Sequence, residues 1–216
     1  MAVIIEGFCV ITRRDAIERK FPGGWDAFLE FVPTRQICWD QDIVRATFMR
    51  AEDATEFLNR MIGQHLEFMR GDECIDISII SQAGSLKRNT PWLTLATLNH
   101  PRIGGEVRTA SMVGSADTGV AAPEGWRYEK SLYANLMVDL KDLKYLRRDG
   151  NVDVYWHPDR KEEIYVGVVY QSVPSAARTE QPPAEPAADP RVRATATRPW
   201  WSHAIANIRA WLGRTS

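Results

Sequence analysis

The first arrangement that could support catalysis is a glutamate that is followed, further along the chain, by an aspartate and a lysine two residues apart. Glu124 follows a proline, and Asp139-Leu140-Lys141 comes later. In metal-dependent nucleases, two carboxylates hold Mg²⁺ and a lysine polarises the attacking water. The same residue types suit an exposed helix start. The pattern therefore predicts a hydrolase only if Glu124, Asp139 and Lys141 converge in a cleft.

Two short acidic motifs are the other candidates. Asp40 and Asp42 lie beside Trp39, and two carboxylates at this spacing in an extended chain can bind one hard cation. Asp117-Thr118-Gly119 matches the aspartic-protease triplet, which works as a pair of carboxylates sharing one proton. The sequence has no second copy, although a homodimer could supply one. Because polar turns need the same residues, we interpret both motifs as turns.

Histidine and cysteine residues form no recognisable metal-binding pattern. The four histidines lack H-x-x-x-H spacing, and none has a cysteine at ligand spacing, which argues against a zinc site. The sequence also lacks a P-loop, a dinucleotide-binding fingerprint and a G-x-S-x-G motif. We therefore expect no cofactor and no resident metal, and we favour a protein that is not an enzyme.

Composition is typical of a soluble globular protein. The chain has 216 residues, of which 44% are hydrophobic and 25% charged, and its formal net charge is −1. A near-neutral chain has no general attraction to nucleic acid, so we do not expect a nucleic-acid partner. No stretch approaches the roughly 18 apolar residues that span a bilayer, and the N-terminus lacks the basic region of a signal peptide. Three widely spaced cysteines indicate a reducing compartment, and we expect a cytoplasmic protein.

The elements around these residues are clearest in the stretch from Asp42 to Met69. The apolar residues Val44, Ala46 and Phe48 occupy every second position and so share one face of an extended chain, which predicts a half-buried strand. The next apolar residues follow the helical period and predict an amphipathic helix: Ala54, Phe57, Leu58, Met61 and Ile62. Leu66 to Met69 then predicts a returning strand.

We predict an α+β fold with antiparallel sheets and helices packed on one face. Residues 1–73 read as β-α-β-β-α-β, an order compatible with a ferredoxin-like sandwich. Residues 74–170 are richer in strands and predict a second α+β unit, packed with the first into one globular body. Within this unit we expect a strand to about Val138 and a helix over 139–148, with Leu140, Leu143 and Leu146 inward; one continuous helix from Trp126 is the alternative. A terminal hairpin follows. Five tryptophans beside apolar periodic positions are expected in the core: Trp25, Trp39, Trp92, Trp126 and Trp156.

The C-terminal part changes character. Residues 171–198 are rich in proline and alanine and lack aromatic residues, which predicts a disordered linker. Residues 199–213 predict an amphipathic helix, and from Pro190 to Ser216 there are five arginines and no acid. The candidate binding residues of this helix are Trp200, Trp201, Ile205, Ile208, Arg209, Trp211 and Leu212.

Three classes of function remain open from the sequence. We favour a non-catalytic cytoplasmic binding protein, an adaptor or an immunity-type neutralising partner, which uses the tethered helix to dock on a protein. One alternative is a metal-dependent hydrolase or nuclease. The other is a peripheral membrane protein, because arginines beside tryptophans suit an anionic membrane surface. The helix could also pack back on residues 1–170.

Overall fold

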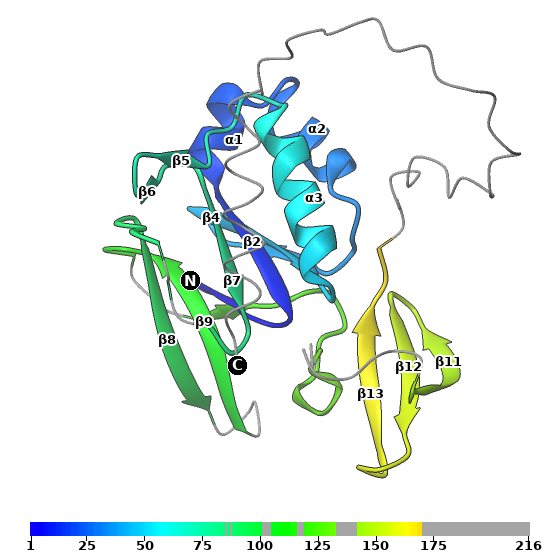
Figure 1. Cartoon of the computed structure of the whole chain (residues 1–216). Coiled ribbons are helices and arrows are strands. Elements are labelled where there is room, and N and C mark those ends of the chain that lie inside the picture. The colour runs from blue at the N-terminus through cyan, green and yellow to red at the C-terminus, as the bar shows by residue number, and fades with distance from the viewer. Residues whose placement is uncertain (85, 87, 101–104, 116–118, 133–141, 170–216) are drawn as a thin grey trace, which may run out of the picture. The chain divides into compact units, whose positions relative to one another are not determined.

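The computed structural model describes residues 1–84, 86, 88–100, 105–115, 119–132 and 142–169, which all belong to one compact unit, Met1–Gln171 (Figure 1). The predicted linker 171–198 and helix 199–213 lie outside the described residues. The α+β class is confirmed, because the described residues form three α-helices and several mainly antiparallel sheets. No helix among them is long and apolar enough to cross a membrane.

The first sheet is antiparallel and has the strand order β3-β4-β2-β7. Its strands are β2 (Phe8–Arg13), β3 (Ile37–Trp39), β4 (Ile43–Phe48) and β7 (Ile77–Ser81). Three helices lie on one face of it: α1 (Arg14–Lys20), α2 (Gly24–Phe31) and α3 (Ala51–Ile62) (Figure 1). The predicted strand and helix between residues 43 and 62 are therefore confirmed.

Helix α3 packs on this sheet through its predicted apolar stripe. Phe57 and Met61 are buried, and the ring of Phe57 lies 5.2 Å from that of Phe48 on β4. The predicted returning strand at Leu66–Met69 is wrong. That region contains only β5 (Met69–Arg70), paired with β6 (Glu73–Cys74). The strand that returns to the sheet is β7, because its isoleucine-rich sequence pairs along five positions of β2.

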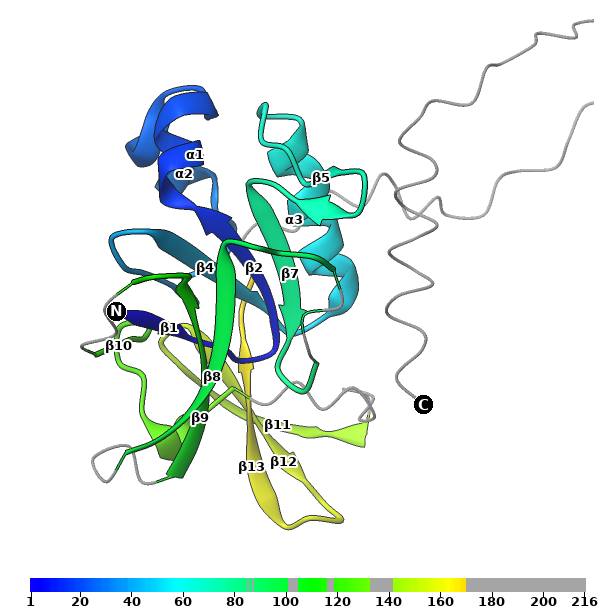
Figure 2. The same ribbon diagram turned by 90° about the vertical axis from the view of Figure 1, so that its left-hand side faces the viewer.

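A second sheet, with the order β10-β1-β9-β8, covers the opposite face of the first (Figure 2). Its strands are β1 (Ala2–Ile4), β8 (Leu93–His100), β9 (Gly105–Met112) and β10 (Val120–Ala121). Apolar residues from both sheets form one core, including Val3, Ile11 and Ile80. The chain crosses from β1 to β2 at Gly7, where φ is +60° and a Cβ would lie 2.6 Å from the Phe48 carbonyl oxygen.

A third, three-stranded antiparallel sheet contains β11 (Lys144–Asp149), β12 (Val152–His157) and β13 (Glu162–Gly167). The predicted terminal hairpin is present. The predicted helix over 139–148 is wrong, because residues 144–149 form β11 and Leu146, expected inside, is 40% exposed. A two-residue turn at Gly150, where φ is +58°, connects β11 to β12 and allows the two strands to pair. This pairing, and not the local spacing of the leucines, determines the structure of the segment.

The two halves of the chain share both large sheets. β1, near the N-terminus, pairs with β9 and β10, and β2 pairs with β7. Strand pairing therefore interleaves residues 1–73 with residues 74–170 in both of these sheets. This interleaving brings residues 29–39 next to residues 121–124, where the candidate site lies.

Candidate functional site

A partly open groove of about 1140 Å³ lies beside β3. Three segments that are distant in the sequence form it: the end of α2 with β3, the residues after β10, and the turn between β11 and β12. Its lining residues are Leu29, Glu30, Val32, Pro33, Thr34, Arg35, Ile37, Cys38, Trp39, Ala121, Ala122, Glu124 and Asn151. Sequence reasoning missed this groove because no local motif connects these segments.

Strand β3 is the edge of its sheet, and its outer backbone groups are open along the groove. On the side that faces β4, the Gln36 carbonyl oxygen accepts a hydrogen bond from the Thr47 N–H at 2.9 Å. The Asp40 backbone N–H donates one to the Ile43 carbonyl oxygen at 3.0 Å. In an antiparallel pair, successive residues alternate between facing the partner strand and facing away. Ile37 and Trp39 therefore direct their N–H and C=O groups outward, and these groups have no hydrogen-bond partner among the described residues.

Trp39 is the large apolar side chain of this groove, and it is 40% exposed. The sequence predicted it in the core, which is wrong because β3 is an edge strand. Its ring stands edge-on to Trp25 at 5.6 Å, and Trp25 stacks on Phe28 at 5.8 Å. The Arg14 guanidinium lies 4.5 Å from the Trp25 ring centroid. Trp39 is thus held in one orientation by a stack of aromatic rings.

The charged side chains of the groove are exposed. Glu30, Glu124 and Arg35 line it, and none of them has an ion-pair partner among the described residues. Two carboxylates against one guanidinium give this surface a net negative charge. A ligand with positive charge is therefore favoured over an anionic one.

A buried polar layer lies behind the groove wall. Cys38 is 4% exposed, and its Sγ donates to the Ala121 carbonyl oxygen at 3.4 Å. Arg45 is fully buried and donates to the Gln36 carbonyl and the Thr47 hydroxyl, while its Nε and Nη2 have no partner among the described residues. Burial raises the pKa of the Cys38 thiol, and Arg45 acts in the opposite direction. A buried thiol with a raised pKa is a weak nucleophile.

Glu6 is a buried acid that the sequence analysis did not treat as a site residue. It is 1% exposed. Its Oε1 accepts hydrogen bonds from Trp126 Nε1 at 2.8 Å, Ser131 Oγ at 2.5 Å and the Leu132 N–H at 3.1 Å. These contacts attach the segment after Glu124 to the junction between β1 and β2. The signal for this role was an acid inside an otherwise apolar run.

The predicted catalytic set is only partly described. Glu124 is exposed on the groove, whereas Asp139 and Lys141 lie outside the described residues. Asp40 is buried, and its Oδ1 accepts the N–H groups of Asp42 and Ile43, both at 2.8 Å. This geometry is that of a turn between two strands. Within the described ranges, no cluster of three His, Cys, Asp or Glu residues is placed to hold a metal ion.

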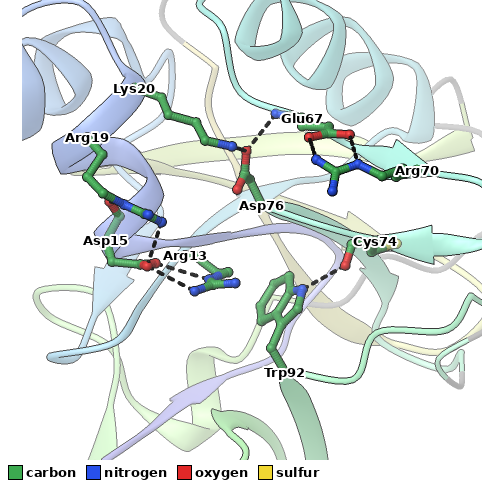
Figure 3. Close-up of polar contacts among 9 residues, drawn as sticks. All are labelled: Arg13, Asp15, Arg19, Lys20, Glu67, Arg70, Cys74, Asp76 and Trp92. Atoms are coloured by element: carbon green, nitrogen blue, oxygen red, sulfur yellow. Dashed lines mark hydrogen bonds and ion pairs between the residues drawn. The ribbon is translucent and has the colours of Figure 1, made fainter.

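A separate polar cluster joins α1 to the segment before β7 (Figure 3). Asp76 is 2% exposed and accepts hydrogen bonds from Lys20 Nζ at 2.6 Å and from the Glu67 N–H at 2.8 Å. Nearby, Trp92 Nε1 donates to the Cys74 carbonyl oxygen at 2.9 Å. Because these groups satisfy one another, we interpret the cluster as structural.

Comparison of the chain with protein-family models, with curated proteins and with solved structures found no match.

Proposed function

We propose that this chain is a non-catalytic binding protein and that the groove beside β3 is where a protein partner docks. The observation that carries the proposal is the exposed Trp39, fixed by Trp25 on an open groove. Tryptophan residues in pockets supply much of the binding energy at protein interfaces. A rigid side chain also loses little conformational entropy when a partner binds.

The chemistry of the groove supports binding more than catalysis. Cys38 is the cysteine that lines the groove, and burial raises the pKa of its thiol, which makes the thiol a poor nucleophile. Glu124 is an exposed carboxylate, and hydrolysis would require Asp139 and Lys141 to meet it with a metal ion. We therefore retain the hydrolase only as the sequence-level alternative.

The strand order of the first sheet supports a finer description of the platform. Taken in chain order, β2, β3, β4 and β7 follow a β-α-β-β-α-β order, with α1 and α2 in the first crossover and α3 in the second. β7 takes the place of the fourth strand that was predicted at Leu66–Met69. We infer a ferredoxin-like arrangement in which β3 is an outer strand. A second sheet on the far face leaves this edge available to a partner.

We also propose that residues 199–213 are a second, tethered docking element, which lies outside the described residues. The proposal rests on the amphipathic pattern around Trp201, Ile205 and Trp211 and on the neighbouring arginines. An amphipathic helix of this kind suits an apolar groove on a partner. Binding at a membrane surface is the alternative for the same residues.

The test uses tagged full-length protein isolated from the cells that produce it, with Trp39→Ser and Tyr145→Ser as a matched pair of variants. Tyr145 is also an exposed aromatic residue that stands edge-on to a neighbouring ring, Tyr155, at 5.6 Å. We expect a partner that is recovered with the wild type and with Tyr145→Ser but lost with Trp39→Ser. Binding is then confirmed with purified components. A partner retained equally by all three proteins would show that the groove is not the binding site.

A further inference from the structure

The unpaired backbone groups of β3 indicate the backbone conformation of the partner segment that binds there. Each of Ile37 and Trp39 has one donor and one acceptor facing the groove without a partner among the described residues. The interior of a partner's helix cannot satisfy them, because the backbone groups there are already used within the helix. An extended segment can, because a strand presents alternate N–H and C=O groups at the right spacing.

We propose that the groove binds an extended peptide segment of a partner protein, which adds to β3 as a further strand and carries at least one basic side chain. This inference rests on the proposed function, because it names the partner chemistry for the same groove. Strand addition derives its affinity from main-chain hydrogen bonds and its specificity from pockets for alternate side chains.

The lining of the groove fits the side chains of such a strand. Successive side chains of an extended segment point to opposite sides, so one set would face the protein and the other solvent. The apolar lining residues Val32, Ile37 and Trp39 offer contact to aliphatic side chains of the inward set. Ala121 and Ala122 are small and leave room for these side chains.

Charge on the groove defines the second requirement. Glu30 and Glu124 are exposed carboxylates without ion-pair partners among the described residues, and Arg35 is the one lining cation. A lysine or arginine on the bound segment would meet a net negative surface. This charge complementarity favours basic over acidic peptides and increases the association rate.

The structure already contains a short example of this type of pairing. Val169, the last described residue, forms an antiparallel bridge with Thr34, which also lines the groove. An extended segment thus pairs with the chain just before β3 begins. The open groups of Ile37 and Trp39 lie three and five residues further along, beyond a bend at Arg35.

The experiment selects peptides from a displayed random library of about eight residues, the length of an ordinary strand, on immobilised full-length protein. We expect enriched sequences that alternate apolar residues and contain lysine or arginine. Each enriched peptide is then synthesised with backbone N-methyl groups at odd or at even positions. Because only alternate residues face β3, one set should weaken binding at least about tenfold and the other should leave it nearly unchanged.

Two variants of β3 provide the matched control. Ile37→Pro removes one outward N–H while leaving the inward bonds of the neighbouring residues, and edge strands tolerate proline in this orientation. Ile37→Val keeps the N–H and the strand preference. We expect peptide affinity to fall about tenfold in Ile37→Pro and to stay unchanged in Ile37→Val. Thermal melting checks that both variants are folded, and the N-methyl series provides the test should Ile37→Pro not fold.

Each outcome supports or overturns the inference. Failure to enrich any peptide, or equal effects of the two N-methyl sets, would overturn strand addition. Enrichment of acidic rather than basic peptides would overturn the charge assignment. A natural partner that needs Trp39 but is indifferent to Ile37→Pro would overturn the inference while leaving the proposed function intact. A partner indifferent to both would overturn the proposed function itself.

Discussion

Arg45 and Glu6 are ionisable side chains that are buried in the protein interior. Arg45 Nε and Nη2 and Glu6 Oε2 have no hydrogen-bond partner among the described residues. Placing a charge in a protein interior costs several kcal/mol unless other groups compensate. Glu6 fixes the segment at Trp126 and Leu132, and Arg45 fixes the Gln36 carbonyl beside β3. Both side chains therefore hold segments that lead to the groove.

At the protein surface, the electrostatic pair that should respond most clearly to pH is Arg147 with Glu163. The guanidinium donates to both carboxylate oxygens, at 2.8 and 2.9 Å. The pKa of Glu163 is lowered from 4.5 to about 2, mainly by the hydrogen bond from Arg147 and further by the one from Tyr165. A carboxyl whose pKa falls on folding stabilises the folded state above its unfolded pKa, and this contribution is lost as pH falls through the folded value.

We predict that an NMR titration of the Glu163 carboxyl gives a pKa of about 2 in the wild type and a pKa shifted upward, toward 4.5, in Arg147→Gln, where the hydrogen bond from Tyr165 still lowers it. Any stability difference between the two proteins should therefore disappear between about pH 4.5 and pH 2. Arg148→Gln is the control, because Arg148 pairs with Asp153. An unchanged Glu163 pKa in Arg147→Gln would contradict the assignment.

Among the elements, α3 gives the most direct test of packing. Phe57 is 2% exposed and contacts the rings of Phe31 and Phe48. We predict that Phe57→Ala lowers the free energy of unfolding by about 3–5 kcal/mol, the usual loss for emptying a buried aromatic site. Chemical denaturation measures this value.

Arg60 is the internal comparison for this helix. It lies off the apolar stripe, but its guanidinium is 4.3 Å from the Phe31 ring centroid. We therefore predict a loss of about 0.5–1 kcal/mol for Arg60→Ala, from the cation–π contact. Equal losses at Phe57 and Arg60 would contradict the orientation of α3.

The spacing of apolar residues correctly predicted the elements that bury one continuous apolar face. It failed where a segment fitted the helical spacing but forms a strand. Val44, Ala46 and Phe48 and the α3 stripe were read correctly because their apolar faces are continuous. The spacing of Leu140, Leu143 and Leu146 matched a helix, yet residues 144–149 form an exposed edge strand. Strand pairing with β12 decided that segment, and pairing between segments cannot be read from local periodicity.

At the scale of the whole molecule, all described elements belong to the unit Met1–Gln171. We predict that a truncation after Ser172 melts in one cooperative transition with a midpoint close to that of the full chain. Differential scanning calorimetry of both proteins checks this, with agreement of the calorimetric and van't Hoff enthalpies as the criterion. A non-cooperative or aggregated truncated protein would show that residues 173–216 contribute to the core.

The candidate site can also be recognised only from the whole molecule. Glu124 was singled out from the sequence and does line the groove, but for a motif whose other members lie outside the described residues. Trp39 was assigned to the core because its neighbours are apolar. Only the strand order shows that β3 is an edge and that residues 121–124 lie beside it. The site therefore could not be predicted from any single segment.

The crossing at Gly7 has a consequence for synthesis on the ribosome. β2 finds all of its sheet partners within the next seventy or so residues, by Ser81, whereas β1 must wait for β9, which begins at Gly105. During that interval, the nascent chain carries an apolar strand, Ala2–Ile4, with no partner to cover it. Chaperones that recognise short apolar segments in nascent chains would therefore have time to bind this strand.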